Sequence, residues 1–274
     1  MKFVYKFKAM STVCELIIYA TQKAKADSTA ESVVKEVKRL EKKYNYYDEN
    51  SYLSLINKRE EFKLDNESKS LLQRASQYYK STDGIFDITT ATIKDLYSSE
   101  SSTTVLNEKK VQLLPFVGCE NFNIKKDKII FTNQFTKIDL GGFVKEYAVD
   151  RSANIIKKAK VKSALINYGG DIYAIGKKPN GERFKIGIKD PANPTENLEY
   201  IEIENQALTT SASYERNFKV EQLEISHIIS KEELSLSPKS VTVISTNCVE
   251  SGVYSTALMI NPQLKHNNRA IITY

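Results

Sequence analysis

The chain has 274 residues, of which 41% are hydrophobic and 27% charged, and its formal net charge is +6. These values are ordinary for a soluble globular protein with a sizeable core, and no segment reaches the ~18 consecutive apolar residues of a membrane span. The three cysteines, Cys14, Cys119 and Cys248, lie far apart without CxxC spacing, which argues against a disulfide framework or a zinc site.

The first third of the chain shows one strand pattern and two helix patterns. Residues 2–20 alternate in polarity and predict one or two strands. Residues 27–46 repeat apolar side chains at helical spacing, with Asp27 or Ser28 as the expected N-cap, and residues 67–81 predict a second amphipathic helix. Because residues 1–20 contain neither a continuous apolar stretch nor a lipobox, no signal peptide is expected.

The rest of the chain mixes short strands with helices. Residues 98–110 are rich in Ser, Thr and Lys and predict an exposed loop. Short strands are expected at 121–125, 128–132 and 135–140. A helix over 143–158, several further strands and a helix in "VESGVYSTALMI" complete the pattern. The sequence therefore predicts an α+β fold of mostly antiparallel sheets with packed helices, in a single domain, 1–274, or in two intimately packed subdomains.

The glycines are concentrated in one part of the chain. Seven of the ten fall between residues 141 and 187. Gly141 and Gly142 lie between a predicted strand end and a predicted helix, where bare backbone at a helix start favours an anion. A second pair, Gly169–Gly170, precedes Asp171. Hairpin turns would also explain glycine, but the neighbouring aspartates favour a ligand at both pairs.

Several familiar site motifs are missing. The sequence has no GxGxxG, GxxxxGK[ST] or GxSxG pattern. Its lysines are scattered, without interleaved aromatic residues, so a nucleic-acid partner is not expected. His227 lies on an apolar strand pattern, which fits either a packing residue or a functional one. Gly252 and Thr256 share one face of the last predicted helix, which fits either close packing or a site.

Taken in order, the segments "IDLGGFVKEYAVD", "ALINYGGDIYAIGKKPNGERFKIGIKDP", "TTSASYER", "HII" and "STAL" resemble the FAD:protein FMN transferases, the ApbE family. Upstream, "AMSTVCELIIY", "YDENSYLSLIN" and "GIFDIT" are similar to further family segments. The resemblance covers nearly the whole chain and implies an ApbE-like fold.

The resemblance also implies a function. Enzymes of this family move the FMN half of FAD onto a Ser or Thr hydroxyl of a target flavoprotein, release AMP and use Mg²⁺. A flavin-accepting protein would be the partner, and the modification is a post-translational flavinylation. Many members are exported as lipoproteins, whereas this chain, if complete, would be cytoplasmic. Two alternatives remain open: an FAD-binding carrier or scaffold without transferase activity, and an FAD pyrophosphatase.

Carried over by position, the resemblance implies a set of site residues. His227 would be the catalytic base. Val144 would offer its backbone carbonyl, and Thr256 its hydroxyl, to the metal. The residues implied for FAD are Met10, Tyr47, Ile85, Phe86, Asp87, Asp139, Gly142, Lys145 and Ile228.

The sequence departs from the family pattern at the metal and phosphate motifs. Gly252 stands where the metal helix normally carries Asp, and Glu146 stands where a Gly normally follows the lysine. Glu250 would point about 200° away from position 252 on a regular helix, so it is no simple substitute. If the missing acid leaves a gap, Gly252→Asp should raise the affinity for Mg²⁺.

Overall fold

The structure is a computed structural model that describes residues 1–99, 102–193, 195–213, 217–220, 223–226 and 238–274. The helices are α1 (Lys23–Tyr44), α2 (Tyr52–Asn57), α3 (Asn66–Ser81), α4 (Ala91–Lys94), α5 (Leu96–Ser99), α6 (Thr103–Leu113), α7 (Gly141–Lys158) and α8 (Cys248–Ile260), with short 3-10 turns η1 (Ile88–Thr90), η2 (Leu114–Phe116) and η3 (Cys119–Asn121). The strands are β1 (Lys2–Ala9), β2 (Thr12–Tyr19), β3 (Phe122–Lys125), β4 (Lys128–Phe131), β5 (Ser163–Tyr168), β6 (Asp171–Ile175), β7 (Phe184–Lys189), β8 (Asn197–Ile203), β9 (Ala207–Ala212), β10 (Asn217–Val220), β11 (Leu223–Ser226), β12 (Ser240–Ser245) and β13 (Arg269–Thr273).

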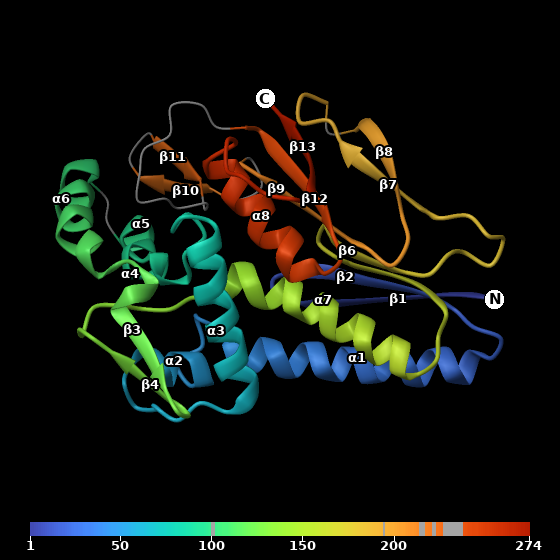
Figure 1. Ribbon diagram of the computed structural model, residues 1–274, viewed down its shortest axis with the longest axis horizontal. Helices are drawn as coiled ribbons and strands as arrows, with labels where there is room; N and C mark the ends of the chain where they lie inside the picture. Colours follow the sequence, from blue (N-terminus) through green and yellow to red (C-terminus); the bar gives the residue numbers. More distant parts are fainter. Residues whose placement is uncertain (100–101, 194, 214–216, 221–222, 227–237) are drawn as a thin grey trace.

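A seven-stranded sheet organises the fold, with the strand order β1-β2-β5-β6-β9-β12-β13. Every neighbouring pair in this sheet is antiparallel. Helices α7 and α8 run beside the sheet, whereas the separate β3–β4 hairpin lies away from it, near α2 (Figure 1). The predicted combination of antiparallel sheets and packed helices is confirmed.

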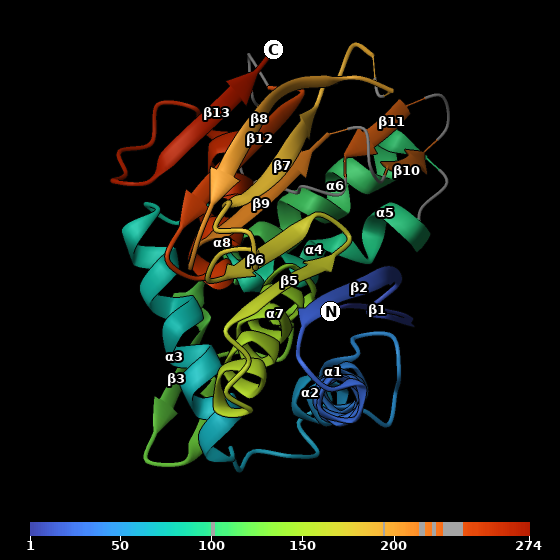
Figure 2. The ribbon, with the colours of Figure 1, turned by 90° about the vertical axis from the view of Figure 1, so that its right-hand side faces the viewer.

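The two faces of the sheet bury different partners. Alternation along β6 sends Ile172 and Ala174 to one face, where they pack with the apolar side chains of the β7–β8 hairpin. The same alternation sends Tyr173 and Ile175 to the opposite face, into the large core with α1 and α7. Figure 2 shows the hairpin and the helices on opposite sides of these strands. Odd-numbered residues of β6 therefore face α7, and even-numbered residues face the hairpin.

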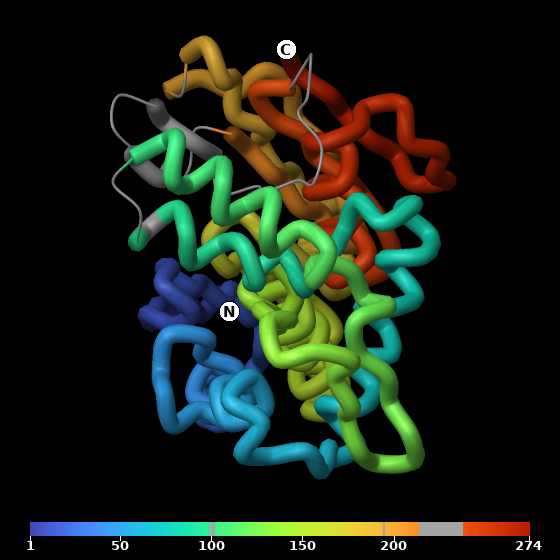
Figure 3. The backbone as a smooth tube through the Cα atoms, turned by 90° about the vertical axis from the view of Figure 1, so that its left-hand side faces the viewer, coloured from blue at the N-terminus to red at the C-terminus, as the bar shows by residue number. Residues whose placement is uncertain are grey.

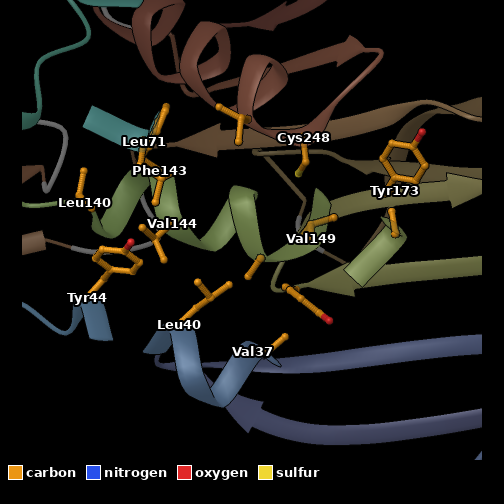
Figure 4. Packing of buried hydrophobic residues seen from close by; sticks show 14 of the residues in the cluster. Val37, Leu40, Tyr44, Leu71, Leu140, Phe143, Val144, Val149, Tyr173 and Cys248 are labelled. Atoms are coloured by element: carbon orange, nitrogen blue, oxygen red, sulfur yellow. The ribbon is translucent and has the colours of Figure 1, made fainter. Parts of the chain in front are cut away.

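Helix α7 is the centre of the large core. Its residues Phe143 and Val149 pack between Leu40 of α1 and Cys248 of α8, and all four are almost fully buried. The close-up in Figure 4 shows α7 lying between α1 on one side and α8 on the other. Because α7 begins at the Gly141–Gly142 turn, this packing fixes the position of that turn.

Three sequence predictions of local structure are wrong. Helix α1 begins at Lys23 rather than at 27, and Asp27 instead accepts a hydrogen bond from Tyr5 Oη at 2.8 Å. The predicted loop at 98–110 contains helix α6, which forms part of the side facing the viewer in Figure 3. Leu106 of α6 is 4% exposed, so burial of an apolar side chain stabilises this helix, which the polar composition of the segment did not predict.

The predicted strand at 135–140 is also wrong. The segment is extended, but the side-chain amide of Asn57 pairs with it in place of a neighbouring strand. Asn57 Oδ1 accepts from the Ile138 amide, and Asn57 Nδ2 donates to the Ile138 carbonyl, both at 2.8 Å. One side chain thus satisfies the backbone groups that a strand partner would otherwise satisfy. Within the described residues, no helix is long and apolar enough to cross a membrane.

Glu67, in the first turn of α3, joins this helix to α1. Its carboxylate accepts from Arg39 at 2.7 Å and from Lys43 at 2.8 Å. Partial burial raises the pKa of Glu67, but these two cations outweigh it and lower the pKa to about 2. A carboxyl whose pKa is lower in the folded state than its ordinary 4.5 stabilises the fold above that value. This stabilisation disappears as the pH falls from about 4.5 towards 2.

Glu67→Gln is therefore expected to lower the free energy of unfolding by about 1–2 kcal/mol at pH 7 and by much less at pH 3. Urea unfolding of both proteins at the two pH values measures this difference. Glu49→Gln, at a carboxylate that is 85% exposed and 3.4 Å from Lys58, serves as the control and should leave the free energy of unfolding unchanged at both pH values. A loss that is equal at both pH values would contradict the role given to the Glu67 charge.

Candidate functional site

The start of α7 presents bare backbone to the surface. Gly141 and Gly142 are both exposed, and Gly142 departs from helical geometry, with φ −87° and ψ 20°. A Cβ built on Gly142 would meet no described atom within 4 Å. The Gly141 amide donates to Asp139, and the Phe143 and Val144 amides donate to the Leu140 carbonyl, so the open space leaves the Gly142 amide accessible to an anion. The first Gly-Gly pair thus leaves room for an anion beside the Gly142 backbone.

Asp139, just before this turn, is held in place from two sides. Its Oδ1 accepts from the Gly141 amide at 2.8 Å, and its Oδ2 accepts from Lys94. The Lys94 ammonium also lies 4.9 Å from the ring centres of both Tyr46 and Tyr47. Tyr47 itself is 74% exposed, so its ring presents a wide surface close to the turn.

The segment Ile85–Asp87 lies against the same turn. The Asp139 amide donates to the Ile88 carbonyl at 2.9 Å, and the rings of Phe86 and Phe143 are 5.8 Å apart. Asp87 is 8% exposed and its Oδ1 accepts from the Thr89 amide at 2.8 Å, which caps the short η1 turn. Ile85 packs into the smaller core beside α8. These three predicted residues therefore connect the start of α7 with α8.

Met10 lies in the two-residue turn between β1 and β2. Its φ of 51° is left-handed, and its amide donates to Glu41 Oε1 at 2.5 Å. The second glycine pair forms the similar turn between β5 and β6, where Gly169 and Gly170 have φ values of +62° and +99°. Such a hairpin turn needs positive φ at both positions, so the turn itself explains this pair.

Lys145 is paired with a buried acid. Its Nζ lies 2.9 Å from Oδ2 of Asp171, and Asp171 is 2% exposed. Asp171 is the first residue of β6, and the alternation described above turns it towards α7. Lys145 remains 23% exposed, so its ammonium can interact with the buried acid and with an anion at the surface at the same time.

Strand β9 and helix α8 share a row of hydroxyl groups. Alternate β9 residues face the helix, where Thr209 bonds Ser251 at 2.7 Å and Ser211 bonds Ser255 at 2.8 Å. Ser211 Oγ also lies 3.3 Å from the hydroxyl of Thr256. The predicted metal ligand Thr256 thus lies at the end of a row of hydroxyl oxygens, and oxygen atoms are the donors that Mg²⁺ prefers.

Two acidic residues of α7 that the sequence prediction missed contact α8. Asp150 accepts from the Cys248 amide at 2.7 Å and from the Val249 amide at 3.1 Å, which caps the start of α8. Burial, followed by the charge of Asp171, raises the pKa of the Cys248 thiol well above its usual value. Cys248 is therefore a protonated core residue rather than a nucleophile.

The second missed residue is Glu146, which is 6% exposed. A Cβ built on Gly252 would come within 2.5 Å of Glu146 Cγ and 3.2 Å of its Oε1. Glu146 Oε2 is buried and makes no hydrogen bond within the described part of the chain. Burial, with a further contribution from Asp171, raises the pKa of Glu146 well above its usual range. The space beside Gly252 is therefore filled, and the hypothesis of an open gap needs correction.

Several described members of the predicted site lie at the start of α7 or contact it: Phe86 packs on Phe143, and Tyr47 lies near Lys94, which pairs with Asp139, whereas Met10 is bonded to α1. Val144 is 5% exposed and lies on α7 between the Gly-Gly turn and Glu146. His227 and Ile228 lie outside the described residues. Within those residues, no three His, Cys, Asp or Glu side chains form a group that could hold a metal ion.

Two surface grooves lie elsewhere. One, of about 670 Å³, runs between β1 and α1, and the other, of about 460 Å³, lies at the start of α8 near Glu250 and Arg269. Their linings include none of the predicted site residues. The candidate site is thus a surface built around the Gly-Gly turn and not one of these two grooves.

Comparison with known proteins finds relatives that share one name. A protein from Klebsiella pneumoniae called FAD:protein FMN transferase is 32% identical over 126 residues, which span 44% of this chain and 38% of that protein. A protein of the same name from Chlamydia pneumoniae is 28% identical over 79% of this chain and 71% of its own length.

The fold comparison agrees. The crystal structure of the ApbE protein from Thermotoga maritima has a TM-score of 0.85 and 27% identity, and the match covers 95% of this chain and 87% of that one. The sequence pattern that describes the ApbE family matches residues 10–270. The chain therefore belongs to the ApbE family.

Proposed function

We propose that this protein transfers FMN from FAD to a Ser or Thr hydroxyl of a target flavoprotein, releases AMP and requires Mg²⁺. The observation that carries the proposal is the gathering of the predicted FAD residues around the exposed Gly141–Gly142 backbone. They come from the loop that carries Tyr47, the segment before η1 and the start of α7, which also carries Lys145. The relatives named as FAD:protein FMN transferases support the same reaction.

In this proposal the start of α7 binds the diphosphate of FAD. The exposed Gly142 amide and the Lys145 ammonium offset the negative charge of the phosphates. The exposed ring of Tyr47 offers apolar surface to the flavin or the adenine close to the turn, and the buried ring of Phe86 supports the turn by packing on Phe143. Binding at this turn would hold the diphosphate in one orientation, which is the main requirement of phosphoryl transfer.

The reaction itself is a substitution at phosphorus. The target hydroxyl oxygen attacks the phosphorus on the FMN side of the diphosphate, and the bond from that phosphorus to the bridging oxygen breaks. AMP leaves with the bridging oxygen and its electron pair, and a new phosphoester bond joins FMN to the target. The hydroxyl proton passes to a base, for which His227 remains the prediction.

The residues around Thr256 suit a divalent cation. They offer the hydroxyl oxygens of Ser211 and Ser255, and the carboxyl of Glu146, whose Oε2 makes no hydrogen bond within the described residues, lies beside Gly252 one turn earlier on α8. When bound, Mg²⁺ would offset negative charge on the phosphate oxygens. The predicted ligands are the Val144 carbonyl and the Thr256 hydroxyl. Mg²⁺ commonly takes one or two carboxylates, with phosphates and water completing its shell, so a small set of protein donors is sufficient.

An incubation with FAD, Mg²⁺ and an acceptor domain tests the proposal. The acceptor is one that the Chlamydia pneumoniae relative labels, and that relative provides the positive control. Flavin fluorescence on the denatured acceptor together with an equal amount of AMP is expected, and EDTA should abolish both. AMP without labelled acceptor would indicate a pyrophosphatase instead. Bound FAD with neither product would indicate a flavin-binding protein without transfer activity.

A further inference from the structure

Two departures from the family pattern meet at one point in the fold. Position 146 has gained a carboxylate and position 252 has lost one, and the two positions are 106 residues apart in the chain. The Glu146 side chain nevertheless occupies the space directly beside Gly252, since a Cβ there would lie 2.5 Å from Glu146 Cγ. A bulkier residue at 252 would collide with Glu146, so the two exchanges are sterically linked.

The orientation of Glu146 is the second observation. It is 6% exposed, and its buried Oε2 has no hydrogen-bond partner among the described residues. A buried carboxylate oxygen without a partner is costly, and a bound cation is one of the few ways to offset that cost. The aliphatic part of Glu146 already fills the space that the missing acid would occupy. The carboxylate itself therefore lies where a cation ligand on α8 would lie.

Thr256 lies on the same face of α8 as Gly252, and its hydroxyl contacts Ser211 Oγ of β9 at 3.3 Å. Gly252 and Thr256 are four residues apart on α8 and share one face of the helix. Helical side chains lean towards the helix start, so the Thr256 side chain lies over the turn that contains Gly252. Val144 precedes Glu146 by two residues on α7. The α8 face that Glu146 contacts at Gly252 thus carries the Thr256 hydroxyl one turn further on.

We propose that Glu146 on α7 supplies the carboxylate ligand of the divalent cation, in place of the acid that the family carries at position 252 of α8. The proposal deepens the proposed function and rests on its use of a divalent cation. It makes this site a relocated version of the family arrangement rather than a damaged one. The carboxylate reaches the same point in space from the neighbouring helix.

Mn²⁺ is a suitable probe because its binding can be followed by electron paramagnetic resonance of the free ion, with and without FAD. Glu146→Gln keeps the shape of the side chain and removes its charge. We expect it to weaken Mn²⁺ binding at least about 10-fold. Glu250→Gln removes a charge from the first turn of α8, where Glu250 is bonded to Ser245 at 2.8 Å, and should leave Mn²⁺ binding unchanged.

The sharper test is the exchange variant, which combines Glu146→Gly with Gly252→Asp. Gly252→Asp alone should lower the melting temperature, because the new side chain meets Glu146. Glu146→Gly alone should weaken Mn²⁺ binding as Glu146→Gln does. Glu146→Gly combined with Gly252→Asp should restore Mn²⁺ affinity to within about threefold of the parent protein, since the carboxylate returns from the other helix.

Parent-like Mn²⁺ affinity in Glu146→Gln would overturn the proposal, and so would an absence of Mn²⁺ binding by the parent protein in the presence of FAD. A folded exchange variant that binds Mn²⁺ no better than Glu146→Gly would also overturn it. If the exchange variant does not fold, the result for Glu146→Gln decides. Because none of these measurements uses flavin transfer, Glu146-dependent Mn²⁺ binding in a protein without transfer activity would refute the proposed function alone.

Discussion

Replacement of Asp150 by alanine is expected to lower the free energy of unfolding by about 2–4 kcal/mol. The Asp150 carboxylate accepts hydrogen bonds from the amides of Cys248 and Val249, at 2.7 and 3.1 Å. Both of those residues are fully buried, so water cannot easily replace the lost acceptor. Each amide left without an acceptor costs about 1–3 kcal/mol, and the favourable interaction of the carboxylate with the α8 dipole is lost as well.

Urea unfolding at pH 8 measures this effect. Burial raises the pKa of Asp150 above its usual value although the two amides oppose this shift, so an alkaline pH favours the carboxylate form. Asp48→Ala is the matched control, because Asp48 also accepts from a backbone amide, that of Asn50 at 3.0 Å, but in an exposed turn. The control should cost less than about 1 kcal/mol. Equal losses in the two variants would show that Asp150 does not hold α8 in place.

Asp150→Ala should also weaken Mn²⁺ binding. Asp150 lies on α7, one turn after Glu146, and it fixes the start of α8 against α7. If α8 moves, Thr256 and Gly252 move away from Glu146. Weaker Mn²⁺ binding in a variant that is still folded would therefore report the alignment of the two helices. The same variant with parent-like Mn²⁺ affinity would separate the stability of α8 from the geometry of the site.

Sequence periodicity predicted elements well where one local pattern dominates. The β3–β4 hairpin, α3, α7 and α8 lie where the alternation or helical spacing of apolar residues placed them. The failures share a different cause. The segment at 135–140 is extended because the side chain of Asn57 binds it, and α6 exists because Leu106 is buried. In both cases a tertiary contact decides the structure, and no local sequence pattern predicts that contact.

The candidate site also contains features that a local sequence pattern predicts and features that depend on tertiary contacts. The bare backbone at Gly142 could be predicted, because glycine at a helix start is itself the signal. The pairing of Lys145 with Asp171, and of Glu146 with the space beside Gly252, could not be predicted from spacing. One signal for the second pairing does lie in the sequence: a carboxylate is gained in one family motif and lost in another. Such a compensating exchange indicates that the two positions are close together in the fold.

The pair formed by Lys145 and Asp171 gives the other large expected effect. Lys145→Met should lower the free energy of unfolding by about 3–5 kcal/mol, because it removes the ammonium that balances an acid that is only 2% exposed. Asp171→Asn should cost less, since Lys145 is 23% exposed and can turn towards water. The double variant should be more stable than the sum of the two losses predicts, by at least about 2 kcal/mol.

The same variants separate stability from the binding of FAD. The double variant lacks the cation at the start of α7 without leaving the buried acid charged, so it should fold and bind FAD about 10-fold more weakly than the parent. Asp171→Asn keeps Lys145 and should bind FAD at least as tightly as the parent. Titration of flavin fluorescence measures both affinities. A folded double variant with parent-like FAD affinity would mean that Lys145 serves the fold through Asp171 and does not neutralise the diphosphate.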